Sequence, residues 1–108
     1  MTFAFATDER ALHAFRDEAE ATAYAEGIDV EDGVWLFFAQ DGTPLEPVFT
    51  TANQRGWFTV RSGAYRLQKT NSQQVSGLLE LLPQAAAVEG ELTSVQSVRR
   101  FLANGSSQ

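Results

Sequence analysis

The sequence predicts an α+β fold, in which helices pack on the apolar face of an antiparallel sheet of about four to five strands. Two aromatic-rich segments, at about residues 33–50 and 56–69, alternate around turn dipeptides and are typical of β-hairpins. Three further segments, at about residues 8–26, 72–82 and 93–104, place apolar residues at helical spacing. Together these segments predict one sheet with a helical layer.

The N-terminal segment predicts a short strand followed by a helix. Residues 3–6 alternate two phenylalanines with alanines, as in a strand. Thr7 is a favourable N-cap residue, and the apolar spacing that begins at Leu12 predicts a helix that ends at Gly27. The spacing weakens midway along this segment, so whether helix 8–26 is continuous remains open.

The dipeptide Asp41-Gly42 suits the two-residue type I′ turn of a first hairpin, because both central positions of that turn need positive φ. In the resulting register Phe38 faces Leu45, and one face of the hairpin is wholly apolar. The residues of that face are Val34, Leu36, Phe38, Leu45, Pro47 and Phe49. Because its prolines cannot donate ladder hydrogen bonds, the second strand is expected to be an edge strand or a bulged one.

The dipeptide Ser62-Gly63 predicts a second hairpin in which Val60 opposes Tyr65; a three-residue loop is the alternative register. The less apolar face of the sheet is then a candidate ligand-binding surface of aromatic and basic side chains. Its members are Trp35, Phe37, Trp57, Arg61 and Arg66. Periodicity does not decide whether a helix covers this face.

The C-terminal third predicts two helices. Leucines at helical spacing run up to Pro83, which is expected to end helix 72–82. Thr93 and Gln96 match the capping-box pattern at the start of helix 93–104.

Length and composition predict one domain over residues 1–104 with a flexible tail over 105–108. The absence of cysteine excludes disulfides, thiolate chemistry and zinc sites that contain cysteine. No segment approaches the roughly 20 apolar residues of a membrane helix, and the N-terminus lacks the features of a signal peptide. We therefore expect a cytoplasmic protein without a membrane partner.

Charge is distributed unevenly along the chain. Residues 1–46 hold 11 acidic and 2 basic side chains, whereas residues 47–108 hold 3 acidic and 6 basic ones. Seven carboxylates follow one another without a cation: Asp17, Glu18, Glu20, Glu26, Asp29, Glu31 and Asp32. Either the acidic and basic surfaces partly neutralise one another across the fold, or the acidic patch recruits a protein with a basic surface.

No catalytic or metal-binding motif stands out. His13 is the sole histidine and falls on a helical face that is expected to be solvated, without a pocket. The stretch at residues 29–33 fails as a calcium loop, because its glycine is misplaced and the distal glutamate is missing. Glu26 and Asp29 show no sign of sharing a cleft as paired carboxylates. We therefore expect no enzymatic activity, no cofactor and no metal.

Segments of residues 24–68, including EGIDVEDG, WLFF and SGAYRL, resemble small bacterial domains of unknown function. The resemblance implies a bacterial cytosolic domain and supplies no catalytic residue.

Two functional hypotheses remain. The first is a non-enzymatic protein-interaction or regulatory module, an adaptor or an immunity-type inhibitor, that uses the acidic patch. The second is a binder of a small ligand or single-stranded nucleic acid on the aromatic and basic sheet face. The acidic composition, with pI near 4.6, argues against nucleic acid. A homodimer through the proline-containing edge or the aromatic face is a further alternative.

Overall fold

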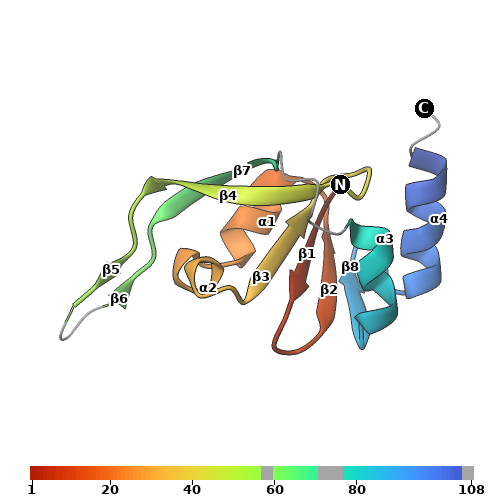
Figure 1. Ribbon diagram of the computed structural model, residues 1–108, viewed down its shortest axis with the longest axis horizontal. Coiled ribbons are helices and arrows are strands. Elements are labelled where there is room, and N and C mark those ends of the chain that lie inside the picture. The colour runs from red at the N-terminus through yellow and green to blue at the C-terminus, as the bar shows by residue number, and fades with distance from the viewer. Residues whose placement is uncertain (57–59, 71–76, 106–108) are drawn as a thin grey trace.

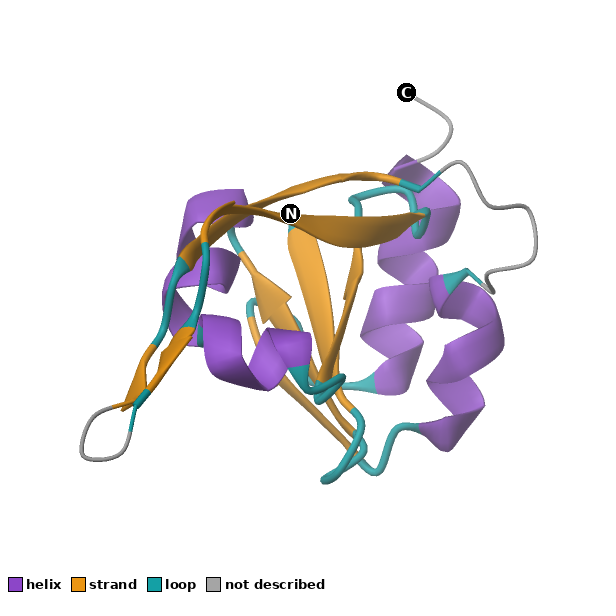
Figure 2. Ribbon diagram, turned by 60° about the vertical axis from the view of Figure 1, so that its left-hand side comes forward, coloured by secondary structure: helices purple, strands orange, loops and turns teal. Residues whose placement is uncertain are grey.

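A computed structural model describes residues 1–56, 60–70 and 77–105 and shows a six-stranded mixed sheet with helices on both faces (Figures 1 and 2). Its elements, in chain order, are β1 (Thr2–Ala6), β2 (Ala11–Phe15), α1 (Glu18–Tyr24), α2 (Gly27–Glu31), β3 (Trp35–Phe38), β4 (Pro44–Thr51), β5 (Gln54–Arg55), β6 (Val60–Arg61), β7 (Ala64–Lys69), α3 (Leu78–Leu81), the 3₁₀ helix η1 (Leu82–Gln84), β8 (Ala87–Gly90) and α4 (Val95–Gly105).

The strand order in the main sheet is β7-β4-β3-β1-β2-β8. Strand β8 runs parallel to β2, and the other neighbouring strands are antiparallel. Strands β5 and β6 pair separately and extend the β4–β7 ribbon into an arm that projects from the rest of the molecule (Figure 1). The α+β class is therefore confirmed, whereas a purely antiparallel sheet of four to five strands is not.

The expected helix at residues 8–26 is largely wrong, because residues 11–15 form strand β2. All five residues of β2 are buried. A strand covered on both faces shows no polar alternation, so a short apolar run of this kind is easily read as part of a helix. Thr7 is not an N-cap; its amide donates a 2.7 Å hydrogen bond to the Val34 carbonyl. The helix begins later, where Asp17 accepts a 2.9 Å hydrogen bond from the Glu20 amide.

The first hairpin has a three-residue loop, so the register predicted from Asp41-Gly42 is wrong by one residue. The Ala39 amide donates to the Thr43 carbonyl at 2.8 Å, and Gly42 has a φ of 86°. This is the geometry of a type I turn followed by a left-handed glycine. Phe37 consequently pairs with Leu45, and the shift moves Leu45 to the opposite face of the sheet.

The predicted second hairpin at residues 56–69 is also wrong, because β7 pairs with β4 along its length, from Lys69 opposite Leu45 to Ala64 opposite Thr51. Gly63 belongs to a close approach of two chain segments, since an added Cβ would lie 1.9 Å from the Thr51 carbonyl oxygen. Strand β4 is therefore internal, with a register irregularity between Phe49 and Thr51. Its Pro47 lies beyond the two residues of β4 that pair with β3.

Two hydrophobic clusters lie on opposite faces of the sheet. On one face, helices α3 and α4 pack through Leu78, Val98 and Leu102 against Phe3 and other side chains of the central strands. On the other face, α1 and α2 cover a second cluster that contains Phe37. The open question of whether a helix covers the Trp35 and Phe37 face is thus answered: two short helices do.

The C-terminal helices differ in detail from prediction. Residues 72–76 of the predicted helix 72–82 lie outside the described residues, and α3 continues into η1, which includes Pro83. The helix predicted at 93–104 is confirmed as α4, with a different cap. Ser94 and Ser97 exchange hydrogen bonds of 3.0 and 3.1 Å between each amide and the other hydroxyl, so the box begins one residue after Thr93.

Candidate functional site

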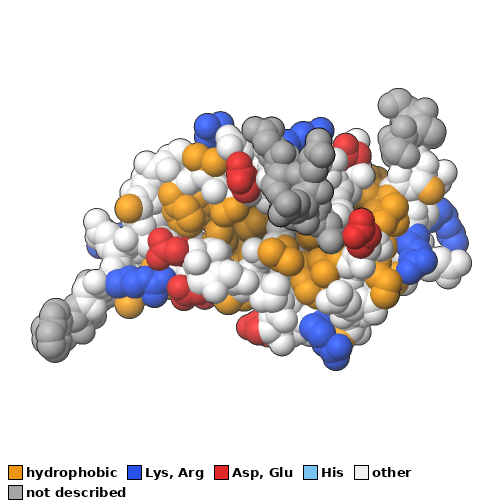
Figure 3. Space-filling model, viewed as in Figure 1, with side chains coloured by type: hydrophobic (Ala, Val, Ile, Leu, Met, Phe, Trp, Pro, Cys, Tyr) orange, Lys and Arg blue, Asp and Glu red, His pale blue; other side chains and the backbone are white. Residues whose placement is uncertain are grey.

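The seven predicted patch carboxylates divide into those with partners inside the fold and those without. Glu18 accepts a 2.7 Å hydrogen bond from the Leu67 amide, and Glu20 lies 3.5 Å from Arg16. Glu31 and Asp32 both pair with Arg55, at 3.2 and 2.9 Å. Figure 3 shows basic and acidic side chains close together at the base of the arm, to which Arg55 of β5 belongs.

Together with Asp17 at the helix cap, five of the seven carboxylates have structural roles. Within the described part of the chain, the side chains of Glu26 and Asp29 form no ion pair or hydrogen bond, and both are exposed. Partial neutralisation across the fold therefore accounts for much of the acidic run. Of the two remaining carboxylates, Glu26 lies between α1 and α2, and Asp29 lies within α2.

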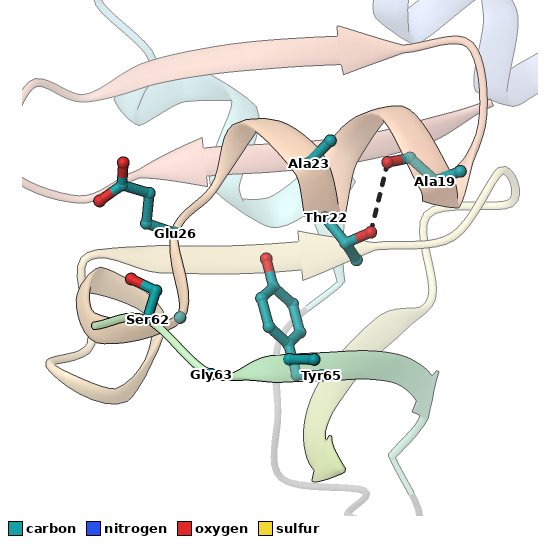
Figure 4. Close-up of a pocket in the computed structure, with 9 residues that line it drawn as sticks. Ala19, Thr22, Ala23, Glu26, Ser62, Gly63 and Tyr65 are labelled. Atoms are coloured by element: carbon teal, nitrogen blue, oxygen red, sulfur yellow. Dashed lines mark hydrogen bonds between the residues drawn. The ribbon is translucent and has the colours of Figure 1, made fainter. Parts of the chain in front are cut away.

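Glu26 lies at an open groove between helix α1 and the start of strand β7 (Figure 4). The groove has a volume of about 370 Å³. Its lining is mostly small: Ala19, Thr22, Ala23, Glu26, Gly27, Ser62, Gly63, Ala64 and Tyr65. Glu26 is the only charged residue among these, so the lining of the groove carries one carboxylate and no basic side chain.

Three hydrogen-bonded connections hold α1 and α2 against β7 and define the groove. At one end Glu18 binds the Leu67 amide. In the middle the Tyr65 hydroxyl donates a 2.6 Å hydrogen bond to the Ala25 carbonyl. At the other end Asn53 bridges the two segments, because its amide group donates to the Gly27 carbonyl at 3.0 Å and accepts from the Gly63 amide at 2.7 Å.

The Tyr65 side chain forms one wall of the groove, and burial raises its pKa to about 12. Its ring also contacts Phe37 and Phe49, with centroids 5.9 and 5.4 Å away. Figure 4 shows this ring pointing from β7 toward α1, where Thr22 lies. The wall is therefore fixed by packing at one end of the side chain and by a hydrogen bond at the other.

The predicted aromatic and basic sheet face is not assembled by the described residues. Phe37 is 2% exposed beneath α1 and α2. Arg61 lies in the arm, and Arg66 alternates with the inward-facing Tyr65 and so points to the other side of β7. Trp35 is partly exposed, and Trp57 lies outside the described residues.

Sequence reasoning placed His13 on a solvated helix, whereas it is 8% exposed in β2. Its ring lies against those of Phe15, Tyr24 and Trp35, with centroids 5.9, 5.2 and 5.3 Å away. Its Nδ1 lies 3.6 Å from a carboxylate oxygen of Glu89 on β8. In the sheet, the small residue Ala4 pairs with His13 on one side and with Phe37 on the other.

Sequence reasoning missed the groove itself, because its two walls are separated by about forty positions and meet only through the β4–β7 pairing. The alanines of α1 were the only available signal, and small residues on a helix are common. In the described ranges, no three histidine or carboxylate side chains gather in a way that would hold a metal ion, and no helix has the length and apolarity to cross a membrane.

Comparison with known proteins does not extend this description. No protein-family model, curated protein or solved structure matches the chain. The groove and the unpaired carboxylates of Glu26 and Asp29 are therefore the features from which a function can be inferred.

Proposed function

We propose that this protein is a non-enzymatic interaction module, regulatory in the manner of an adaptor or an immunity-type inhibitor, that binds a basic surface on another protein. The observation that supports it best is that two exposed carboxylates have no partner among the described residues: Glu26, which lines a groove without a cation, and Asp29 in the adjoining helix α2. A carboxylate that already pairs with an arginine of its own chain gains less from a basic partner than an unpaired carboxylate does. Glu26 and Asp29 are therefore available to pair with a basic partner.

We propose a non-enzymatic role because His13, the one histidine, packs against aromatic rings and does not line the groove. A bacterial, cytoplasmic setting is part of the same proposal and rests on the sequence resemblance. The alternative, a ligand or nucleic acid stacked on the sheet face, has less support because Phe37 is covered.

The test is capture of a partner by the wild-type chain from a bacterial lysate at low salt, identification of that partner, and titration of the purified pair. A Glu26→Lys, Asp29→Lys double variant is expected to bind the partner at least about tenfold more weakly, since two attractive charges become repulsive. Affinity of the wild type should fall as salt is raised, and that of the double variant should fall less.

A Glu91→Lys, Glu80→Lys variant is the matched control, because it makes the same change in net charge at exposed carboxylates away from α1 and α2. If both double variants lose the same affinity for the partner, the loss is caused by the change in net charge and not by the position of Glu26 and Asp29. Full affinity of the Glu26 and Asp29 variant at low salt would contradict the proposed binding surface.

A further inference from the structure

We propose that the α1–β7 groove receives the side chain of an arginine from the partner protein, with Glu26 as its counter-ion. This inference rests on the proposed function, because it names the residue type and the exact pocket through which a basic partner is recognised. It is carried by the hydrogen-bonding state of the groove's hydroxyl groups and by the shape of its lining.

Two of the three hydroxyl groups that line the groove already donate their protons to backbone carbonyls of α1 and its end, while the third, Ser62, accepts a 3.5 Å hydrogen bond from the Ile28 amide. Tyr65 donates to Ala25 at 2.6 Å, and Thr22 donates to Ala19 at 3.3 Å, the dashed line in Figure 4. A hydroxyl whose proton is used in this way can only accept from a ligand. The oxygens of Tyr65 and Thr22 therefore present acceptors on both walls of the groove. Figure 4 shows the Glu26 side chain at the end of the groove, directed away from Tyr65 and Thr22, where a cation in the groove can meet its carboxylate.

A guanidinium group matches such a surface because it has five N–H donors and no acceptor. A phosphate, sulfate or carboxylate would meet oxygen lone pairs and a negative charge, and no lysine or arginine lines the groove to offset them. Charge and hydrogen bonding thus select the same class of ligand group, a cation rich in donors.

The shape of the groove favours arginine over lysine. Ala19, Ala23 and Ala64 leave a slot beside the ring of Tyr65. A planar guanidinium stacks on an aromatic ring and forms several hydrogen bonds at fixed angles, whereas an ammonium is a compact and strongly hydrated charge. The connections at Leu67 and Asn53 hold the two ends of the slot in place before any ligand arrives.

The groove suits a side chain carried by a larger molecule better than a free small molecule. Its volume of about 370 Å³ lies at the lower end of the range for small-molecule sites, and it is open to solvent. A free ligand there would keep much of its surface hydrated. A partner protein instead adds contacts outside the groove, for which the exposed carboxylate of Asp29 is available.

The test is an NMR titration of the full chain, labelled with ¹⁵N, with N-acetyl-arginine amide. The amides of Thr22, Glu26, Ser62 and Ala64 are expected to shift in a saturable manner. N-acetyl-citrulline amide, which has the same length and a neutral urea, should give no saturable shift, and N-acetyl-lysine amide should bind more weakly.

Two variants separate the groove from the acidic surface. Ala23→Met fills the slot without altering charge, and Glu26→Gln removes the charge without altering shape; each is expected to weaken arginine binding about fivefold or more. Asp29→Asn is the matched control and should leave binding of this small probe unchanged. Circular dichroism of each variant checks that α1 is retained, and Ala19→Met replaces Ala23→Met should the latter not fold.

Saturable binding of citrulline, or binding of arginine that Ala23→Met leaves unchanged, would overturn the inference. Lysine binding as tight as arginine would overturn the guanidinium assignment. The captured partner distinguishes the two proposals. If the Glu26→Lys, Asp29→Lys variant loses affinity for this partner and Ala23→Met does not, the proposed function is supported and the arginine pocket is refuted. Sedimentation tests a further occupant. If the wild-type chain self-associates and Ala23→Met abolishes this association, a second copy of the chain occupies the groove and a separate partner is refuted.

Discussion

The two faces of the sheet are closed by different means. Toward α3 and α4, the interface consists of large apolar side chains, among them Phe3, Leu12 and Phe38, each no more than 3% exposed. Toward α1 and α2, the strands contribute Ala4, the buried rings of Phe15 and Phe37 and several partly exposed rings, and hydrogen bonds from side chains fasten the helices to β7. Both faces bury hydrophobic side chains, but only the face toward α1 and α2 combines them with side-chain hydrogen bonds and an open groove.

The largest expected contrast between the faces comes from removing one ring on each. Phe3→Ala should lower the free energy of unfolding by about 3–5 kcal/mol, because Phe3 is fully buried and packs edge-on against Phe101. Phe49→Ala, at a partly buried ring on the α1 side, should cost about 1–2 kcal/mol. Urea unfolding of both variants measures the difference, and equal losses would break the comparison.

Replacement of Gly63 tests how tightly the α1 side is assembled. Gly63→Ala should lower stability by about 1–3 kcal/mol, because the new Cβ meets backbone atoms of Thr51 and Ala52 that cannot move aside as a side chain would. Gly33→Ala is the comparison: it has a positive φ but nothing within 4 Å, so about 1 kcal/mol is expected. Thermal unfolding measures both, and a smaller loss at Gly63 than at Gly33 would argue against the close approach.

Alkaline pH tests the buried wall of the groove. Burial raises the Tyr65 pKa to about 12 from an ordinary value of 10.0, so the folded chain holds this proton more tightly than the unfolded chain. The contribution of this raised pKa to the free energy of unfolding is fully present below pH 10 and is lost as pH rises through about 12. Phenolate absorbance of a Tyr24→Phe variant follows Tyr65 alone. Ionisation of the folded protein near pH 10 would contradict the buried wall.

The smallest expected effect lies at the first hairpin loop, which is exposed. The pKa of Asp41 is lowered by its side-chain hydrogen bond with Thr43, then by the Thr43 amide and by Lys69. A lowered pKa contributes stability above pH 3.8 that is lost as pH falls through the folded value. Asp41→Asn should therefore lower the free energy of unfolding slightly at pH 6 and leave it unchanged at pH 2. Urea midpoints at the two pH values check this, and an equal effect at both would contradict it.

Sequence reasoning succeeded where local chemistry decides the structure. The strand at residues 3–6 and the helix at 93–104 are present to within two residues. It failed at ALHAF, because burial on both faces removes the alternation that identifies a strand. It also failed at Asp41-Gly42, where the same residues fit loops of two and of three residues.

The candidate site was predicted only in part. Glu26 and Asp29 belong to the acidic run, but nothing in the run distinguishes them from Glu18 or Glu31, whose partners lie far along the chain. Which carboxylate is left without a partner depends on where β7 and the arm return to the helices. That information lies in the long-range pairing of β4 with β7, and no local pattern encodes it.

The parallel pairing of β8 with β2 has a consequence for the order in which this chain folds. β2 lies in the first sixth of the sequence, yet its outer edge stays unpaired until the segment around Val88 has been made. During synthesis the apolar stretch ALHAF is an open sheet edge, and such edges template aggregation. Nascent chains that end before Ala87 should accordingly depend on chaperones, and completion of β8 should release them.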